Sequence, residues 1–154
     1  MDLDRLSQLF VDGPMPLLRT DFTDDTAWSR IIDEVSRENE ESYTANLEPI
    51  SDTAFDGVTP QDLASAWPRD LHGYVILADQ RSMEEAKADG KPTVAIVDLY
   101  ASEEDEEEFG DVFGAAFRAE SGEVASIEAN LSLANMDFSE FAESVGDEGI
   151  FRGF

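Results

Sequence analysis

Carboxylates lie at the ends of four predicted strands of this chain, at Asp21, Asp52 and Asp79 and, less cleanly, at Asp98. In an open α/β sheet, ligands bind outside the carboxyl ends of the strands. Carboxylate oxygens are ligands that Mg²⁺ and Ca²⁺ prefer. Asp21, Asp79 and Asp98 are therefore candidate metal ligands of a divalent-metal-dependent enzyme or small-ligand binder. We prefer the competing interpretation, in which each aspartate caps the helix or turn that follows it and no cofactor is needed.

Other catalytic chemistry has little support in the sequence. The chain contains no cysteine, which excludes disulfides, thiolate zinc sites and a cysteine nucleophile. Its single histidine, His72, precedes a predicted strand, where a solvated side chain is more common than a general base. No nucleophile elbow, phosphate-binding loop or paired-histidine zinc motif occurs. The sequence therefore favours a protein without enzymatic activity.

The charge of the chain is strongly negative. Thirty-six acidic residues against ten basic ones give a formal net charge of −26. Nucleic acids and anionic membranes attract basic surfaces, so neither is an expected partner. Such a charge also favours a soluble monomer. A basic protein, for instance a nuclease toxin or a nucleic-acid-binding protein, is the predicted partner. The alternative is that the acidic surface reflects only salt adaptation.

Two groups of residues are candidate binding residues for such a partner. A run of adjacent carboxylates must lie in a solvated loop, predicted over residues 101–111, because it cannot be buried. Its members are Glu103, Glu104, Asp105, Glu106, Glu107 and Glu108. The second group, Asn130, Asn135 and Asp137, is a polar cluster in an apolar helical region. Our preferred interpretation of this cluster is structural, namely that it satisfies backbone groups at a helix–helix junction.

Hydrophobic patterning predicts the elements that position these residues. Strands are expected at 17–20, 43–50, 73–79, 93–100 and 112–119, the last antiparallel to its predecessor. Helices are expected after an N-cap at Thr23, after Thr59–Pro60, and at a capping box that begins with Ser82. The C-terminal third predicts two helices with a break near 135–136. The apolar tail is expected to fold back onto the core.

These elements predict one α/β domain built as a three-layer sandwich. Its mixed, mostly parallel sheet of about five strands carries helices on both faces. Residues 1–13 are an amphipathic lead-in, and residues 14–154 form the domain. The acidic N-terminus has no apolar signal region and no apolar run is long enough to span a membrane, so a cytoplasmic protein is expected.

Three segments resemble a small bacterial domain family of unknown function. They are residues 19–28 (RTDFTDDTAW), residues 130–138 (NLSLANMDF) and residues 151–154 (FRGF). The strand ends at Asp79 and Asp98 fit the same family. The resemblance runs from about Pro14 to the C-terminus and implies no activity. The acidic loop is longer and more charged than the resemblance leads one to expect.

Overall fold

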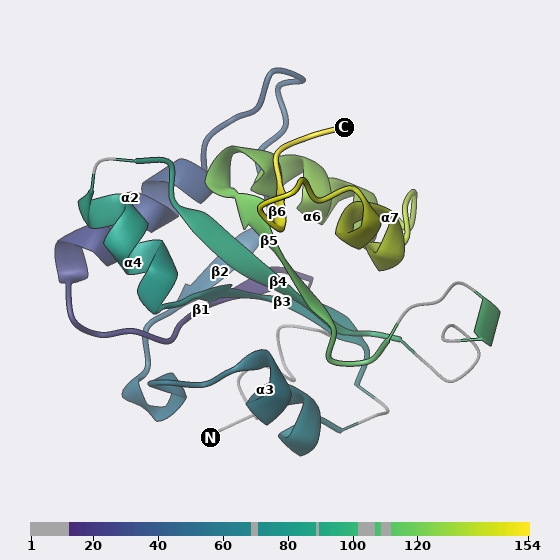
Figure 1. The fold of residues 1–154 in the computed structure, drawn as a ribbon, viewed down its shortest axis with the longest axis horizontal. Helices are drawn as coiled ribbons and strands as arrows, with labels where there is room; N and C mark the ends of the chain where they lie inside the picture. Colours follow the sequence, from purple (N-terminus) through teal and green to yellow (C-terminus); the bar gives the residue numbers. More distant parts are fainter. Residues whose placement is uncertain (1–12, 69–70, 89, 102–106, 109–111) are drawn as a thin grey trace.

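The computed structural model describes residues 13–68, 71–88, 90–101, 107–108 and 112–154. Within them the chain forms a single α/β domain around one six-stranded sheet (Figure 1). The strand order is β2-β1-β3-β4-β5-β6. The strands are β1 (Met15–Arg19), β2 (Leu47–Ile50), β3 (Gly73–Ala78), β4 (Thr93–Leu99), β5 (Ala116–Glu120) and β6 (Ile150–Phe151).

One strand of the sheet, β4, runs in the opposite direction to the others. Strand β4 is antiparallel to both of its neighbours, whereas β1 is parallel to β2 and β3, and β5 is parallel to β6. All strands except β4 therefore run the same way, which confirms a mixed, mostly parallel sheet. As a result, β4 ends at the edge where β1 and β3 begin.

Helices cover both faces of this sheet (Figure 1). On one face α2 (Asp25–Val35), α4 (Gln80–Lys87), α6 (Val124–Ser132) and α7 (Phe138–Glu143) pack on inward-facing strand residues such as Leu17, Ile76 and Ile96. On the other, α3 (Pro60–Ala66) and the short 3₁₀ helix η1 (Thr53–Phe55) cover Leu18, Leu77 and Val97. Adjacent strand residues thus enter opposite cores, which explains the continuous apolar runs of β3 and β4.

Two helix starts differ from the sequence-based expectation. Helix α2 is capped by Asp24, whose carboxylate accepts from the Ala27 amide, and not by Thr23. Helix α4 begins at Gln80, with Asp79 and Ser82 forming the capping box. The predicted box beginning at Ser82 is therefore wrong by one turn, because the carboxylate directly after β3 already caps the helix. The capping of α3 by Thr59, with Pro60 at its first position, is confirmed.

The C-terminal region matches the prediction in part. Two helices, α6 and α7, meet at the expected break. Strand β5 pairs antiparallel with β4 as predicted, but it begins at Ala116 and not at residue 112. Elsewhere in the chain, β2 also starts later than predicted, at Leu47 and not at residue 43. The tail adds β6, a sixth strand that was not expected, and buries Phe151. Phe154 instead remains 77% exposed, although its ring contacts those of Phe141 and Phe151.

Candidate functional site

Three of the strand-end aspartates bind backbone amides at the carboxyl edge of the parallel strands. Asp21 Oδ1 accepts hydrogen bonds from the amide and hydroxyl of Thr23, at 2.9 and 2.6 Å. Asp52 caps η1 through the Ala54 amide at 2.9 Å. Asp79 caps α4 and also forms an ion pair with Arg118 at 2.8 Å. These are the contacts that the capping interpretation predicts.

The fourth aspartate lies at the opposite edge of the sheet. Asp98 pairs in register with Tyr74, near the start of β3, because β4 runs against its neighbours. Its carboxylate is 1% exposed and accepts from the amides of Tyr100 and Ala101, at 2.9 and 3.0 Å. The expectation that Asp98 gathers with Asp21 and Asp79 is therefore wrong. Among the described residues, no group of three potential metal ligands comes together.

The acidic run falls largely outside the residues that the structure describes. Residues Glu103, Glu104, Asp105 and Glu106 lie outside the described part of the chain. Glu107 and Glu108 are described and exposed. Their role in binding stays a prediction.

The polar cluster at the α6–α7 junction is tied to the backbone. The Asn130 side-chain amide donates to the Ser126 carbonyl at 2.8 Å, and the Asn130 carbonyl accepts from the Asn135 amide at 2.9 Å. Asp137 is the N-cap of α7 and forms a capping box with Glu140. Ala134 between them adopts a left-handed conformation with φ of 55°, which is uncommon for a residue with a Cβ. The junction is thus a sharply defined turn.

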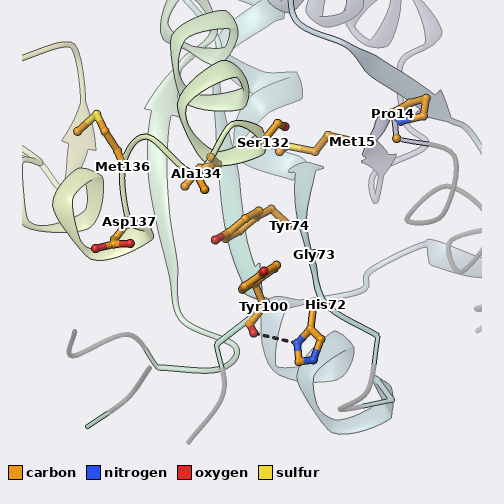
Figure 2. A pocket seen from close by; sticks show the side chains of 12 residues that line it. Pro14, Met15, His72, Gly73, Tyr74, Tyr100, Ser132, Ala134, Met136 and Asp137 are labelled. Atoms are coloured by element: carbon orange, nitrogen blue, oxygen red, sulfur yellow. Dashed lines mark hydrogen bonds between the residues drawn. The ribbon is translucent and has the colours of Figure 1, made fainter. Parts of the chain in front are cut away.

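This turn forms one wall of a pocket of about 330 Å³. The pocket lies at the edge where β1 and β3 begin and β4 ends. The opposite walls come from these strand ends and from the loop before β3 (Figure 2). The lining residues are Gly13, Pro14, Met15, His72, Gly73, Tyr74, Tyr100, Leu131, Ser132, Ala134, Met136 and Asp137. Four stretches of chain that are distant in sequence therefore contribute to one cavity.

A row of aromatic rings crosses this pocket from the core to its mouth. Tyr74 stacks on the buried ring of Phe138 with 6.2 Å between centroids, and on Tyr100 with 5.5 Å between centroids. The Tyr74 and Tyr100 ring planes differ by 6°. Tyr100 is 49% exposed. The contact follows from the antiparallel register, since Tyr100 is the diagonal neighbour of Tyr74. The stack places the half-exposed ring of Tyr100 in the pocket lining.

His72 is held at the outer end of this row. Its ring lies 5.3 Å from that of Tyr100, and its Nδ1 is 3.0 Å from the Tyr100 carbonyl oxygen. Because a carbonyl only accepts, Nδ1 carries the hydrogen in this contact. In Figure 2, Ser132 lies at the other end of the pocket, with both tyrosines between it and His72. His72 is therefore not placed to act as a general base on the Ser132 hydroxyl.

The Ser132 hydroxyl is occupied by a buried carboxylate. It donates to Glu128 Oε2 at 2.6 Å, while Glu128 Oε1 accepts from the Tyr43 hydroxyl at 3.2 Å and the Asn46 amide at 2.5 Å. Burial raises the pKa of Tyr43, and the charge and hydrogen bond of Glu128 raise it further. This network joins α6 to the segment before β2 and holds the side chain of Ser132, which lines the pocket.

The pocket attracts positive charge. Asp137 is acidic, and none of the lining residues is lysine or arginine. The rest of the chain adds to this field, since its formal net charge is −26. Such a surface raises the local concentration of cations.

The aromatic part of the site was not found from the sequence. Asp137 and the junction around Asn130 were candidates, but Tyr74, Tyr100, Met15 and Met136 were not. Two sequence features pointed to parts of this site: the 130–138 segment, which supplies one wall of the pocket, and the single histidine, which precedes Gly73. The pairing of the two tyrosines depends on strand register, which local patterns do not contain.

Fold and pocket together define a single-domain α/β protein with an aromatic-lined pocket at one edge of a mixed sheet. The chain belongs to the family described as "Domain of unknown function (DUF6924)", whose family model matches residues 14–154. Searches of curated proteins and of solved structures found no match to the chain. No helix in the described residues is both long enough and apolar enough to cross a membrane.

Proposed function

We propose that this domain is a non-enzymatic binding module that takes a basic segment of a partner protein, with the pocket around Tyr74 and Tyr100 as the point of contact. The observation that carries the proposal is the combination of aromatic rings and a carboxylate, with no lysine or arginine among the lining residues, in a cavity on a very acidic protein. Aromatic faces and carboxylates both attract cations.

The use of the arginines supports the same function. Every arginine in the described residues bonds to an acceptor of this chain, so these cations are already engaged by the fold. The contacts are Arg19–Asp25, Arg30 with the Ala86 and Gly90 carbonyls, Arg37–Glu34, Arg81–Glu85, Arg118–Asp79, and Arg152 with Glu120 and Glu148. The excess of carboxylates is left to solvent ions or to a partner. Opposite charge on a partner chiefly speeds association and adds specificity.

A titration with a basic peptide tests this function. The probe is a ten-residue peptide of net charge +4, and the control is the same peptide with each basic residue replaced by glutamine. At 0.15 M NaCl, backbone amide NMR shifts should saturate and should centre on residues 72–74, 100 and 131–137. The neutral peptide should cause no saturating shifts. Shifts that are non-saturating, or that spread evenly over the acidic surface, would contradict the proposal.

A further inference from the structure

We infer that the group which enters this pocket is a bulky apolar side chain, carried by the partner segment between its basic residues. This inference rests on the proposed function and names the anchor of the segment. Three features of the pocket carry it: an apolar floor, polar side chains that already bond to the chain itself, and a volume that suits one such side chain.

The burial of the lining residues divides the pocket into a floor and a rim. Met15 and Leu131 are 6% and 5% exposed and belong to the larger core cluster. The polar members His72, Ser132 and Asp137, which Figure 2 labels around the two tyrosines, are all exposed. The pocket therefore has an apolar base on the core and a polar rim in solvent. A mainly apolar lining with a few polar groups is common in ligand sites.

The polar side chains of the rim are engaged within the protein. The Ser132 hydroxyl donates to Glu128, and His72 Nδ1 donates to the Tyr100 carbonyl. Asp137 takes part in the capping box of α7. Among the described residues, no buried side-chain nitrogen or oxygen lacks a hydrogen-bond partner. That part of the chain thus presents a ligand with no orphaned buried polar side chain to satisfy, and van der Waals contact is what the floor offers.

The size of the pocket sets the size of the anchor. Its volume is about 330 Å³, and an apolar cavity of about 150 Å³ already holds a benzene ring. One phenylalanine or leucine side chain therefore fits. Methionine side chains, here Met15 and Met136, adapt to the shape of a bound group and make favourable sulfur contacts with aromatic rings. Phenylalanine is therefore the side chain with which to test the pocket.

The charge around the pocket sets the residues that flank the anchor. None of the lining residues is lysine or arginine, and the formal net charge of the chain is −26. The neighbours of the anchor in the partner therefore meet an acidic surface, which favours basic residues and repels acidic ones. An apolar residue between basic ones thus combines contact area in the pocket with electrostatic discrimination around it.

Four versions of the ten-residue peptide test the anchor. They carry phenylalanine or serine at a central position, and each is made with its basic residues intact or replaced by glutamine. Binding to the wild-type protein at 0.15 M NaCl is followed by the NMR signals of the Met15 and Met136 methyl groups. The basic phenylalanine peptide should bind at least about tenfold more tightly than the basic serine peptide, as burial of one large side chain predicts.

The outcomes separate this inference from the proposed function. If both basic peptides saturate at the pocket with equal affinity, only the apolar anchor is wrong. If neither binds there, the proposed function fails as well. A neutral phenylalanine peptide that binds as tightly as the basic one would contradict the need for basic neighbours. Contacts of the two methionine methyl groups with residues 1–12 in the free protein would show that the chain fills its own pocket, and would overturn the inference.

Two serine variants test whether the anchor enters the cavity. Ser132 lines the pocket at the end of α6, and Ser144 follows α7 outside the lining. Each hydroxyl donates to an acceptor four residues earlier in the chain. Ser132→Leu fills part of the cavity and should weaken binding of the basic phenylalanine peptide about tenfold, whereas the matched control Ser144→Leu should change it less than about twofold.

Melting curves of both serine variants show whether each is folded. Equal losses in Ser132→Leu and Ser144→Leu would place the anchor outside the pocket and overturn the inference. The comparison of phenylalanine and serine peptides uses the wild-type protein, so it decides the inference even where a variant fails to fold.

Discussion

The two edges of the sheet use their polar side chains in different ways. At the carboxyl ends of β1 and β3, Asp21 and Asp79 bind backbone amides, and Arg118 binds Asp79. At the opposite edge, two tyrosines, His72 and Asp137 border an open cavity. At the edge that α/β proteins commonly use for ligands, Asp21 and Asp79 here bind groups of the chain itself. The functional candidate is the edge where β4 ends, because the reversed strand brings Tyr100 there.

The largest effect is expected from removing Arg118. Its guanidinium bonds Asp79 through both nitrogens, at 2.8 and 3.1 Å, and also contacts Thr93. Arg118→Ala should lower the free energy of unfolding by about 2 kcal/mol, a value reduced for partial exposure, because Asp79 keeps its charge without its partner. Urea unfolding at pH 7 measures the change. Tyr100→Ser, at the other edge, should cost less than about 1 kcal/mol. Equal losses would mean that the two edges do not differ in this way.

The pH dependence of the Arg118→Ala effect provides a second test. Burial raises the pKa of Asp79. The hydrogen bond and charge of Arg118, together with the hydrogen bonds of Ser82, lower this pKa by more, so that it lies below its ordinary value. A carboxylate with a lowered folded-state pKa stabilises the fold at neutral pH. That contribution is lost as the pH falls through and below about 4. The difference in unfolding free energy between the wild type and Arg118→Ala should therefore shrink from pH 7 to pH 3. A constant difference would show that Asp79 is not its source.

These contacts show which parts of the structure the sequence could predict. The Thr59–Pro60 cap and the buried runs of β3 and β4 follow from nearby residues, and the structure confirms them. Asp79 was correctly expected to cap a helix. The prediction that Asp98 lies near Asp21 was wrong because it depended on the direction of β4. That direction is decided by pairing with strands distant in the sequence. The tail strand was missed because two residues carry no alternating pattern.

The pocket shows the same limit more clearly. The 130–138 segment and Asp137 were selected from local features, and they form one wall. The other walls come from strand ends that the register brings to this edge. A tyrosine at the start of one strand and a tyrosine after the end of the next are unremarkable in sequence. They meet only because β3 and β4 are antiparallel neighbours.

Salt should stabilise the whole domain by a smaller amount. Burial raises the pKa of Glu123, and the charges of Glu120 and Glu40 raise it further, as repulsion between carboxylates requires. The screening length falls from about 30 Å at 0.01 M salt to about 3 Å at 1 M. Stability should rise on the order of 1 kcal/mol, or about 2–4 °C in melting temperature. Thermal melts in 10 mM and 1 M NaCl at pH 7 measure it. An unchanged or lower melting temperature at high salt would mean that the charges are mutually compensated.

The smallest expected effect is a specific response to divalent cations. Asp21 and Asp79 already bind amides, and Asp98 lies at the other edge of the sheet. Millimolar Mg²⁺ or Ca²⁺ should therefore raise the melting temperature no more than NaCl of equal ionic strength. A larger increment that Asp79→Asn and Asp21→Asn both abolish would favour the metal-site interpretation, since binding to the folded state stabilises it.

The contrast between the edges depends most directly on the charge of Asp137 in the pocket. Asn is as good an N-cap as Asp, so Asp137→Asn removes that charge while it keeps α7 capped. Asp147→Asn removes one exposed carboxylate outside the pocket lining and has the same net charge. The dissociation constant of the basic ten-residue peptide at 0.15 M NaCl should rise about tenfold in Asp137→Asn and less than twofold in Asp147→Asn. Equal changes in the two variants would show that the peptide responds to overall charge alone, and would contradict the pocket as the binding site.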